Sequence, residues 1–227
     1  MRVAIVADAH LGGPGGEPGP LVKQLAELPG QGVERLILLG DIFQAWVGFR
    51  QYETPAVRLV LAAVRALRAS GLRVDYIEGN RDFFLAQGPY VREFDSVGLE
   101  ASFEAEGRRY LCVHGDGLND RDRQYLAWRW LSKSWPVEMM IRTLPRTVLS
   151  RFVDATEKRL SNTNFRHKAE LPEAAIRRFG ERRLSEGHDV LLLGHFHEPR
   201  SFRVAGGEIR LLDAWFRGHR VERFGGG

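Results

Sequence analysis

Apolar residues along the chain fall into short continuous runs, separated by stretches in which they recur at helical spacing. Continuous apolar runs of this length are typical of strands buried on both faces. The runs are residues 3–7, 35–39, 74–78, 110–113 and 190–193. Residues 59–67 have the spacing of an amphipathic helix, and Ala205-Gly206-Gly207-Glu208 predicts a hairpin turn. The order of these elements predicts an α/β fold, an α+β sandwich in which two packed, mixed β-sheets are flanked by helices.

A polar cluster follows each of these runs. The clusters are Asp8-Ala9-His10, Gly40-Asp41, Gly79-Asn80-Arg81-Asp82, His114-Gly115-Asp116 and Gly194-His195-Phe196-His197. Because ligands bind at the carboxyl ends of strands in open α/β sheets, the clusters are predicted to meet at one site. A single His or Asp after a strand is more often a structural residue or a turn former. The repeated match between cluster and strand favours a functional site.

The side chains in these clusters are the donors that two divalent cations require. Carboxylate and imidazole groups suit Mn, Fe, Co, Ni or Zn, whereas several histidines disfavour a site for Mg or Ca alone. Asp41 is the candidate bridging ligand, because a carboxylate offers two oxygens. Two ions about 3.5–4 Å apart can clamp a phosphoryl group and lower the pKa of a shared water. If residues 195–197 are extended, His195 and His197 leave the same face and Phe196 points to the core.

The order of these clusters, from residue 8 to residue 197, resembles that of the calcineurin-like metallophosphoesterases. Within that superfamily, longer strings are similar to the UDP-2,3-diacylglucosamine diphosphatases of lipid A biosynthesis. The strings are residues 40–48, residues 79–85, and His114-Gly115-Asp116 followed by Asp122 and Tyr125. The resemblance implies two divalent ions, expected to be Mn²⁺. It places one ion on Asp8, His10, Asp41 and His197, and the other on Asp41, Asn80, His114 and His195.

The resemblance also implies a reaction. Metal-held hydroxide attacks the α-phosphorus of UDP-2,3-diacylglucosamine, and the products are UMP and 2,3-diacylglucosamine 1-phosphate. Asn80, Arg81 and His114 are the expected catalytic residues, and by analogy Asp116 orients His114. Arginine cannot act as a general acid near neutral pH, but it can fork onto a phosphate, so Arg81 favours a diphosphate substrate with its good leaving group. The alternative for Arg81 is a surface salt bridge with Asp82.

The interval between His114 and His195 is much longer than the intervals between the other clusters. It carries many apolar residues, and between residues 133 and 168 basic residues outnumber acidic ones. Residues 122–168 are therefore predicted to be a helical insertion within a single domain of residues 1–227. In the resembled family this insertion is a lid over acyl chains; the alternative is an ordinary helical hairpin packed on the core. The substrate-binding residues that the resemblance implies are Asn80, Arg81, Asp122, Asn162, Asn164, Lys168 and His195.

Composition narrows the partners and the location. The chain has 227 residues, enough for one well-buried core, and a net charge of only +4 with no basic run interleaved with aromatics. No nucleic acid partner is expected; a lipid-linked nucleotide-sugar substrate or a membrane surface accounts for the basic character. The first residues predict a strand and not a signal peptide, and the single cysteine, Cys112, fits a reducing compartment. The expected location is the cytoplasm, peripheral on the inner membrane, and the oligomeric state is left open.

Two other functions are left open. One is a soluble phosphodiesterase or nucleotide pyrophosphatase of the same superfamily, favoured because Gly48-Phe49-Arg50 stands where the resembled enzymes have a pair of acids. The other is a non-enzymatic binding module with a relic metal site, which the complete ligand set disfavours. Turnover of a phosphoester separates the two enzymes from the binding module.

Overall fold

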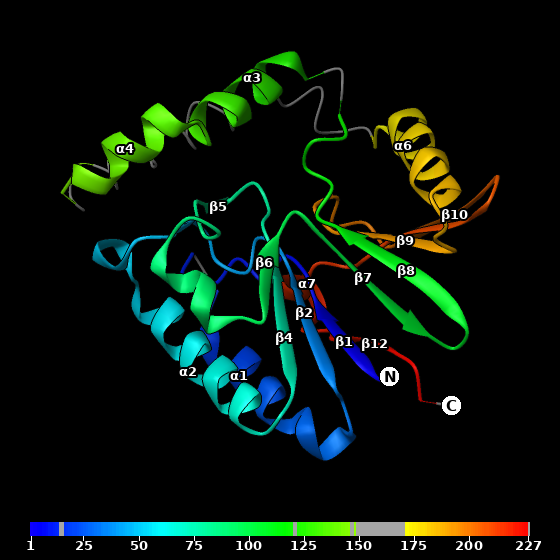
Figure 1. The fold of residues 1–227 in the computed structure, drawn as a ribbon, viewed down its shortest axis with the longest axis horizontal. Coiled ribbons are helices and arrows are strands. Elements are labelled where there is room, and N and C mark those ends of the chain that lie inside the picture. Colours follow the sequence, from blue (N-terminus) through cyan, green and yellow to red (C-terminus); the bar gives the residue numbers. More distant parts are fainter. Residues whose placement is uncertain (14–15, 120–121, 146–147, 149–170, 227) are drawn as a thin grey trace.

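The computed structural model describes residues 1–13, 16–119, 122–145, 148 and 171–226. Two five-stranded sheets pack face to face at its centre, and helices cover their outer faces (Figure 1). The strand order is β12-β1-β2-β4-β6 in the first sheet and β10-β11-β9-β8-β7 in the second, with β3 and β5 forming a small separate pair. Both large sheets mix parallel and antiparallel neighbours. The predicted fold class is therefore confirmed.

The bounds of the strands are β1 Val3–Val6, β2 Arg35–Leu39, β3 Trp46–Val47, β4 Arg73–Ile77, β5 Asp82–Phe83, β6 Ser96–Gly98, β7 Glu100–Ala105, β8 Arg108–Val113, β9 Val190–Leu193, β10 Arg200–Val204, β11 Gly207–Leu211 and β12 Glu222–Phe224. The bounds of the α-helices are α1 Pro18–Glu27, α2 Pro55–Ala69, α3 Arg123–Ser132, α4 Trp135–Thr143, α6 Glu173–Ser185 and α7 Trp215–Gly218. Short 3-10 turns span Pro29–Gln31, Arg50–Tyr52 and Pro89–Glu93.

The continuous apolar runs are explained by burial on both faces of each strand. Along β1, Val3 and Ile5 belong to the core between the two sheets, while Ala4 and Val6 belong to the core under α1 and α2. In the second sheet, alternate residues of β9 face the other sheet or α6 in the same way. Successive side chains of a strand point to opposite faces, so a strand with two buried faces needs apolar residues at every position.

The five predicted runs coincide with β1, β2, β4, β8 and β9, with ends that differ by no more than a few residues. Strands β1, β2 and β4 are parallel, and so are β8 and β9. Their carboxyl ends therefore lie along one edge of the sandwich. The predicted helix is α2, whose N-cap Thr54 accepts a hydrogen bond from the Val57 amide, and the predicted hairpin joins β10 to β11. Cys112 is fully buried in the core.

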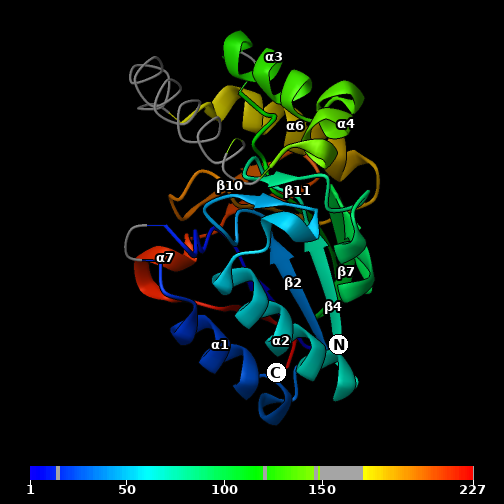
Figure 2. The ribbon, with the colours of Figure 1, turned by 90° about the vertical axis from the view of Figure 1, so that its left-hand side faces the viewer.

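Helices α3 and α4 lie across that edge, above the strand ends (Figures 1 and 2). They fall within the predicted insertion, but most of its second half, with Asn162, Asn164 and Lys168, lies outside the described residues. In the described part of the chain, no helix is long and apolar enough to cross a membrane.

Candidate metal and active site

Seven side chains predicted from the strand ends lie together at the edge of the sandwich. One group contains Asp8, His10 and His197, whose potential ligand atoms lie within 4.8 Å of one another. His197 Nε2 is 3.1 Å from Asp8 Oδ1, and His10 Nε2 is 3.9 Å from the same oxygen. These residues follow β1 in the first sheet and β9 in the second, so the group spans both sheets.

A second group lies beside the first. The Asn80 side-chain oxygen is 3.3 Å from His114 Nε2 and 2.9 Å from His195 Nδ1. Asp41 stands between the groups, with Oδ1 3.6 Å from His114 Nε2 and Oδ2 3.9 Å from His10 Nε2. Its two carboxylate oxygens therefore face different groups, as a bridging ligand requires. Asp8 also lies within ligand range of Asp41 and His114.

The backbone at these side chains departs from the sequence-based expectation. Asp8, His10, Asp41, His195 and His197 all have φ between 49° and 65°, in the left-handed region. The expectation of an extended segment at residues 195–197 is therefore wrong, although Phe196 does pack against the core of the second sheet. Non-glycine residues adopt this conformation at an energetic cost, and such strain concentrates at functional sites.

Two glycines allow the close approach of the strand ends. Gly40 has φ +75°, and a Cβ on it would lie 2.5 Å from His114 Nδ1. A Cβ on Gly79 would overlap the Asp41 carboxylate and would lie 2.8 Å from His114 Nε2. Any side chain at these positions would displace the groups that face one another across the site.

The residues present fit a pair of divalent cations. His10 Nε2 is buried without a hydrogen-bond partner, although it faces two carboxylates. His114 Nδ1 lies 3.0 Å from the Leu39 carbonyl, which fixes the ring and leaves Nε2 directed at Asp41 and Asn80. A mixed set of carboxylate, amide and imidazole donors suits borderline divalent metals.

Burial and close charges shift the protonation of these groups. Burial alone would raise the pKa of Asp8 and of Asp41, but the neighbouring imidazoles hold both below the usual range. Burial would lower the pKa of His114, but the Asp41 carboxylate raises it to about 10. Burial, together with the charge of His114, lowers the pKa of His195 to about 4. The two carboxylates therefore stay ionised and concentrate negative charge where cations would bind.

Arg81 lies beside the buried Asp41 carboxylate. Its Nε is 3.6 Å from Asp41 Oδ2, and its amide donates a 2.8 Å hydrogen bond to Asp41 Oδ1. A surface pair with Asp82 is wrong, because Asp82 is fully buried and accepts from the Gly79 and Asp41 amides and the Tyr76 hydroxyl. Burial, with the charge of Asp41, raises the pKa of Asp82 to about 7.

Asp116 has a different role from the one expected. His114 uses its Nδ1 on the Leu39 carbonyl, while Asp116 accepts hydrogen bonds from the Tyr125 hydroxyl and Arg129 Nε. Asp116 thus holds α3. Asp122, expected near the substrate, accepts from the Tyr125 amide at 2.9 Å and caps the start of α3.

Phe216 is a site residue that sequence reasoning missed. Its ring centroid lies 5.2 Å from that of His10 and 5.1 Å from that of His197. Backbone hydrogen bonds from Trp215 to Ala7 and from Phe216 to Asp8 tie α7 to the end of β1. The aromatic dipeptide was visible in the sequence, but nothing local connects it with the distant histidines.

Comparison with known proteins identifies the class. The sequence model of the calcineurin-like phosphoesterase family matches residues 1–222. The chain belongs to this family, and it is a hydrolase.

The relatives with similar sequences carry more specific names than the family. The UDP-2,3-diacylglucosamine hydrolase of Ralstonia nicotianae is 28% identical over 232 residues, covering 97% of this chain and 86% of the relative. The protein of the same name from Shigella sonnei is 32% identical over 206 residues, covering 88% and 83%. Among solved structures, phosphopantetheinyl hydrolase from Mycobacterium tuberculosis is 15% identical with a TM-score of 0.47, over 98% of this chain and 95% of that one. The resemblance inferred from the strand-end clusters is confirmed.

Proposed function

We propose that the protein is a dinuclear-metal hydrolase that cleaves the diphosphate of UDP-2,3-diacylglucosamine to UMP and 2,3-diacylglucosamine 1-phosphate. The observation that carries the proposal is the two-sided Asp41 carboxylate, with a donor group on each side and the Arg81 guanidinium beside it. The names of the relatives supply the substrate.

We assign Asp8, His10, Asp41 and His197 to one ion, and Asp41, Asn80, His114 and His195 to the other. Two such ions, Mn²⁺ in this proposal, would lower the pKa of a bound water and neutralise charge on the phosphoryl oxygens. The donor atoms are held in place before substrate arrives, because Asp8, Asp41 and His114 are buried and hydrogen bonds position the rings of His114 and His195. We also assign Asn80 and His195 to contact with the substrate phosphate.

Arg81 supplies charge stabilisation. Its guanidinium is partly exposed and is anchored by a 3.0 Å hydrogen bond from one terminal nitrogen to the Gln44 carbonyl. A guanidinium in this position can bind the phosphate whose charge grows as the diphosphate breaks. Since the departing group is a phosphate monoester, it leaves without a general acid.

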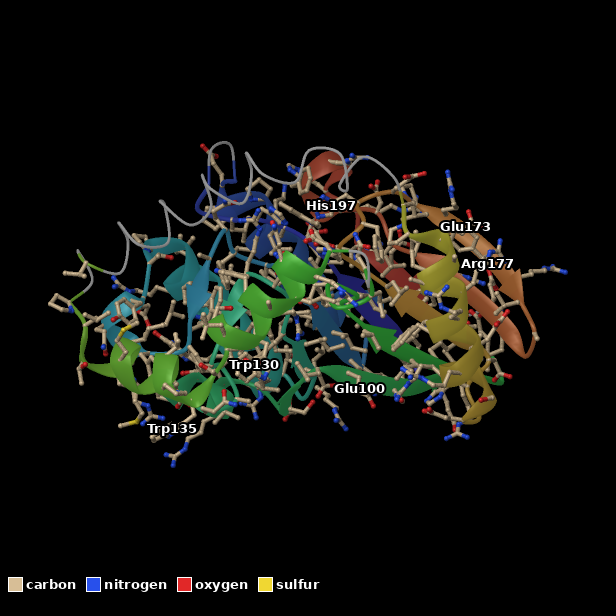
Figure 3. The ribbon with its side chains drawn as sticks, turned by 90° about the horizontal axis from the view of Figure 1, so that it is seen from above. Glu100, Trp130, Trp135, Glu173, Arg177 and His197 are labelled. Atoms are coloured by element: carbon tan, nitrogen blue, oxygen red, sulfur yellow. The ribbon has the colours of Figure 1, made fainter. Side chains whose placement is uncertain are left out.

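Helices α3 and α4 are the part of the protein that we propose contacts the membrane and the lipid substrate. Trp130, Leu131, Trp135 and Met139 are all exposed on them. Seen from above, the labelled Trp130 and Trp135 lie on the outer side of these helices, away from His197 (Figure 3). Large exposed apolar side chains, with the partly exposed Arg142 on α4, suit peripheral contact with an anionic membrane that carries the substrate. Asp122, Asn162, Asn164 and Lys168 stay predictions for the nucleotide-sugar end.

The test is release of UMP from UDP-2,3-diacylglucosamine in detergent micelles, with Mn²⁺ and then with excess chelator. The proposal expects metal-dependent turnover at roughly 1 s⁻¹ or faster, in the ordinary range for an enzyme on its own substrate. UDP-glucosamine without acyl chains is the matched control and should be a much poorer substrate. Efficient turnover of bis-p-nitrophenyl phosphate, with none of the lipid, would instead identify a soluble phosphodiesterase of the same family.

A further inference from the structure

The inner face of α3 carries a polar strip. The strip consists of Tyr125, Arg129 and the C-cap residue Lys133. Because they are spaced by four residues, their side chains leave the same face of the helix. Tyr125 Oη donates to Asp116 Oδ2 at 3.1 Å, Arg129 Nε donates to the same oxygen, and Lys133 Nζ donates to the Gly79 carbonyl at 2.7 Å. Lys133 also lies 5.8 Å from the centroid of the Phe83 ring. The strip makes the polar contacts that hold α3 to the sandwich.

The two partners of this strip belong to different sheets. Gly79 follows β4 in the first sheet and directly precedes Asn80. Asp116 follows β8 in the second sheet, two residues after His114. Asn80 and His114 face each other at 3.3 Å, so α3 bridges the seam between the sheets where these two side chains meet.

Both partners are sensitive to displacement. The Gly79 backbone is pressed so closely against Asp41 and His114 that a Cβ would not fit, so movement of its carbonyl moves Asn80. Asp116 is buried, and Arg129 supplies the countercharge that a buried carboxylate needs. The position of α3 and the geometry of the Asn80–His114 pair are therefore set by the same contacts.

We propose that α3 is a clamp across the two sheets, and that Lys133 is a positioning residue that acts through the Gly79 carbonyl on Asn80. This rests on the proposed dinuclear centre and adds a coupling to it. Binding of the ion assigned to Asn80, His114 and His195 orders α3, and docking of α3 raises the affinity for that ion, because linkage is reciprocal. The ion assigned to His10 and His197 is not coupled in this way.

The test compares Lys133→Met with Lys133→Arg, which keeps a donor, and with Arg142→Met. Arg142 is a matched control because it pairs with Glu138 on α4, 2.6 Å away, and not with the strand ends. Each full-length protein is freed of metal by chelation and titrated with Mn²⁺ while bound ions are counted. Lys133→Met should lose roughly tenfold or more in affinity for one of the two ions, the range typical of partners that orient metal ligands. The affinity of Lys133→Met for the other ion should stay near the wild-type value. Both Mn²⁺ affinities should stay near wild type in the Lys133→Arg and Arg142→Met proteins.

Hydrogen exchange of the wild-type protein gives a second readout that needs no variant. Mn²⁺ should slow amide exchange over Arg123–Ser132, and this protection should be reduced in Lys133→Met. Unchanged Mn²⁺ affinities in Lys133→Met, or α3 exchange that ignores Mn²⁺, would overturn the clamp while leaving the hydrolase intact. A wild-type protein that takes up no Mn²⁺ would overturn both the clamp and the proposed function.

Discussion

Below the strand ends, charged side chains are buried; above them, on α3 and α4, apolar side chains are exposed. Asp8, Asp41 and His114 are at most 2% exposed, whereas Trp130 and Trp135 are 76% and 72% exposed. Each arrangement reverses the usual preference of its residue type. Buried charges persist where partners hold them, and exposed aromatics persist where something else is to be bound. In the proposed function, the buried residues at the strand ends, which form the floor of the site, carry out the chemistry, and helices α3 and α4 bind the lipid.

The two regions also differ in how they are anchored. The floor takes its residues from both sheets and holds five of them in the left-handed backbone region. Such strain survives only where the surrounding structure is rigid. Of the residues on α3 and α4, only Ile141 is buried, in a small cluster with Val47, Phe49, Tyr52 and Phe84. The segment Gly48-Phe49-Arg50, which favoured another substrate, thus lies partly under α4, since Phe49 belongs to this cluster.

Asp41→Asn tests the floor most severely. The amide keeps the shape but removes the charge that faces both donor groups, so we expect turnover to fall by roughly 10³-fold or more, about 4 kcal/mol of barrier. The measurement is kcat with saturating Mn²⁺. Glu104→Gln is the control, since Glu104 is an exposed carboxylate paired with Arg109 away from the site. Near-wild-type turnover of the Asp41 variant would show that Asp41 is not a ligand of the metal centre.

Arg81→Lys separates charge from geometry. A lysine keeps the positive charge but loses the planar fork and the contact with the Gln44 carbonyl. We expect kcat to fall by about 10²-fold, in the range found when one preorganised donor to the transition state is removed. KM should change less, because the lost interaction strengthens as the diphosphate breaks. A change confined to KM would make Arg81 a simple binding residue.

Replacing both Trp130 and Trp135 with Ser tests the other half of the comparison. Burial of one large apolar side chain contributes about 1.5–3 kcal/mol, so the double variant should lose at least about tenfold in affinity for anionic lipid vesicles. Its turnover of the micellar substrate should fall, while its Mn²⁺ binding should stay at the wild-type level. Leu59→Ser is the control for general loss of an exposed apolar side chain, since Leu59 is an exposed residue of α2. Equal vesicle binding by the wild type, the double variant and the control would mean that α3 and α4 are an ordinary helical hairpin and not a membrane-binding surface.

The sequence predicted the floor well, because a strand that is buried on both faces is a continuous apolar run and its end is marked by the next polar residues. Asp8, Asp41, Asn80 and His114 could be placed together on that basis alone. The left-handed backbone of the candidate ligands could not be predicted, since Asp and His adopt it far less readily than glycine does. The partners of Asp116 and the packing of Phe216 on His10 depend on contacts between segments far apart in the chain. The one signal for the clamp that the sequence contains is the regular four-residue spacing of Tyr125, Arg129 and Lys133.

Tyr52→Phe produces the smallest expected effect and probes how loosely the helices are held. The Tyr52 hydroxyl lies 2.7 Å from both the Ile141 and the Leu144 carbonyl oxygens at the end of α4. One hydroxyl hydrogen can satisfy only one acceptor at a time, so the variant should lose about 1 kcal/mol of stability. Hydrogen exchange should rise over Trp135–Thr143 and stay unchanged over β1 and β2. If protection falls equally in the strands, then α4 and the floor of the site unfold as one unit. In that case the helices are not held more loosely than the strand ends. If it falls only in α4, substitutions around Tyr52 can alter which lipid is accepted without disturbing the metal ligands beneath.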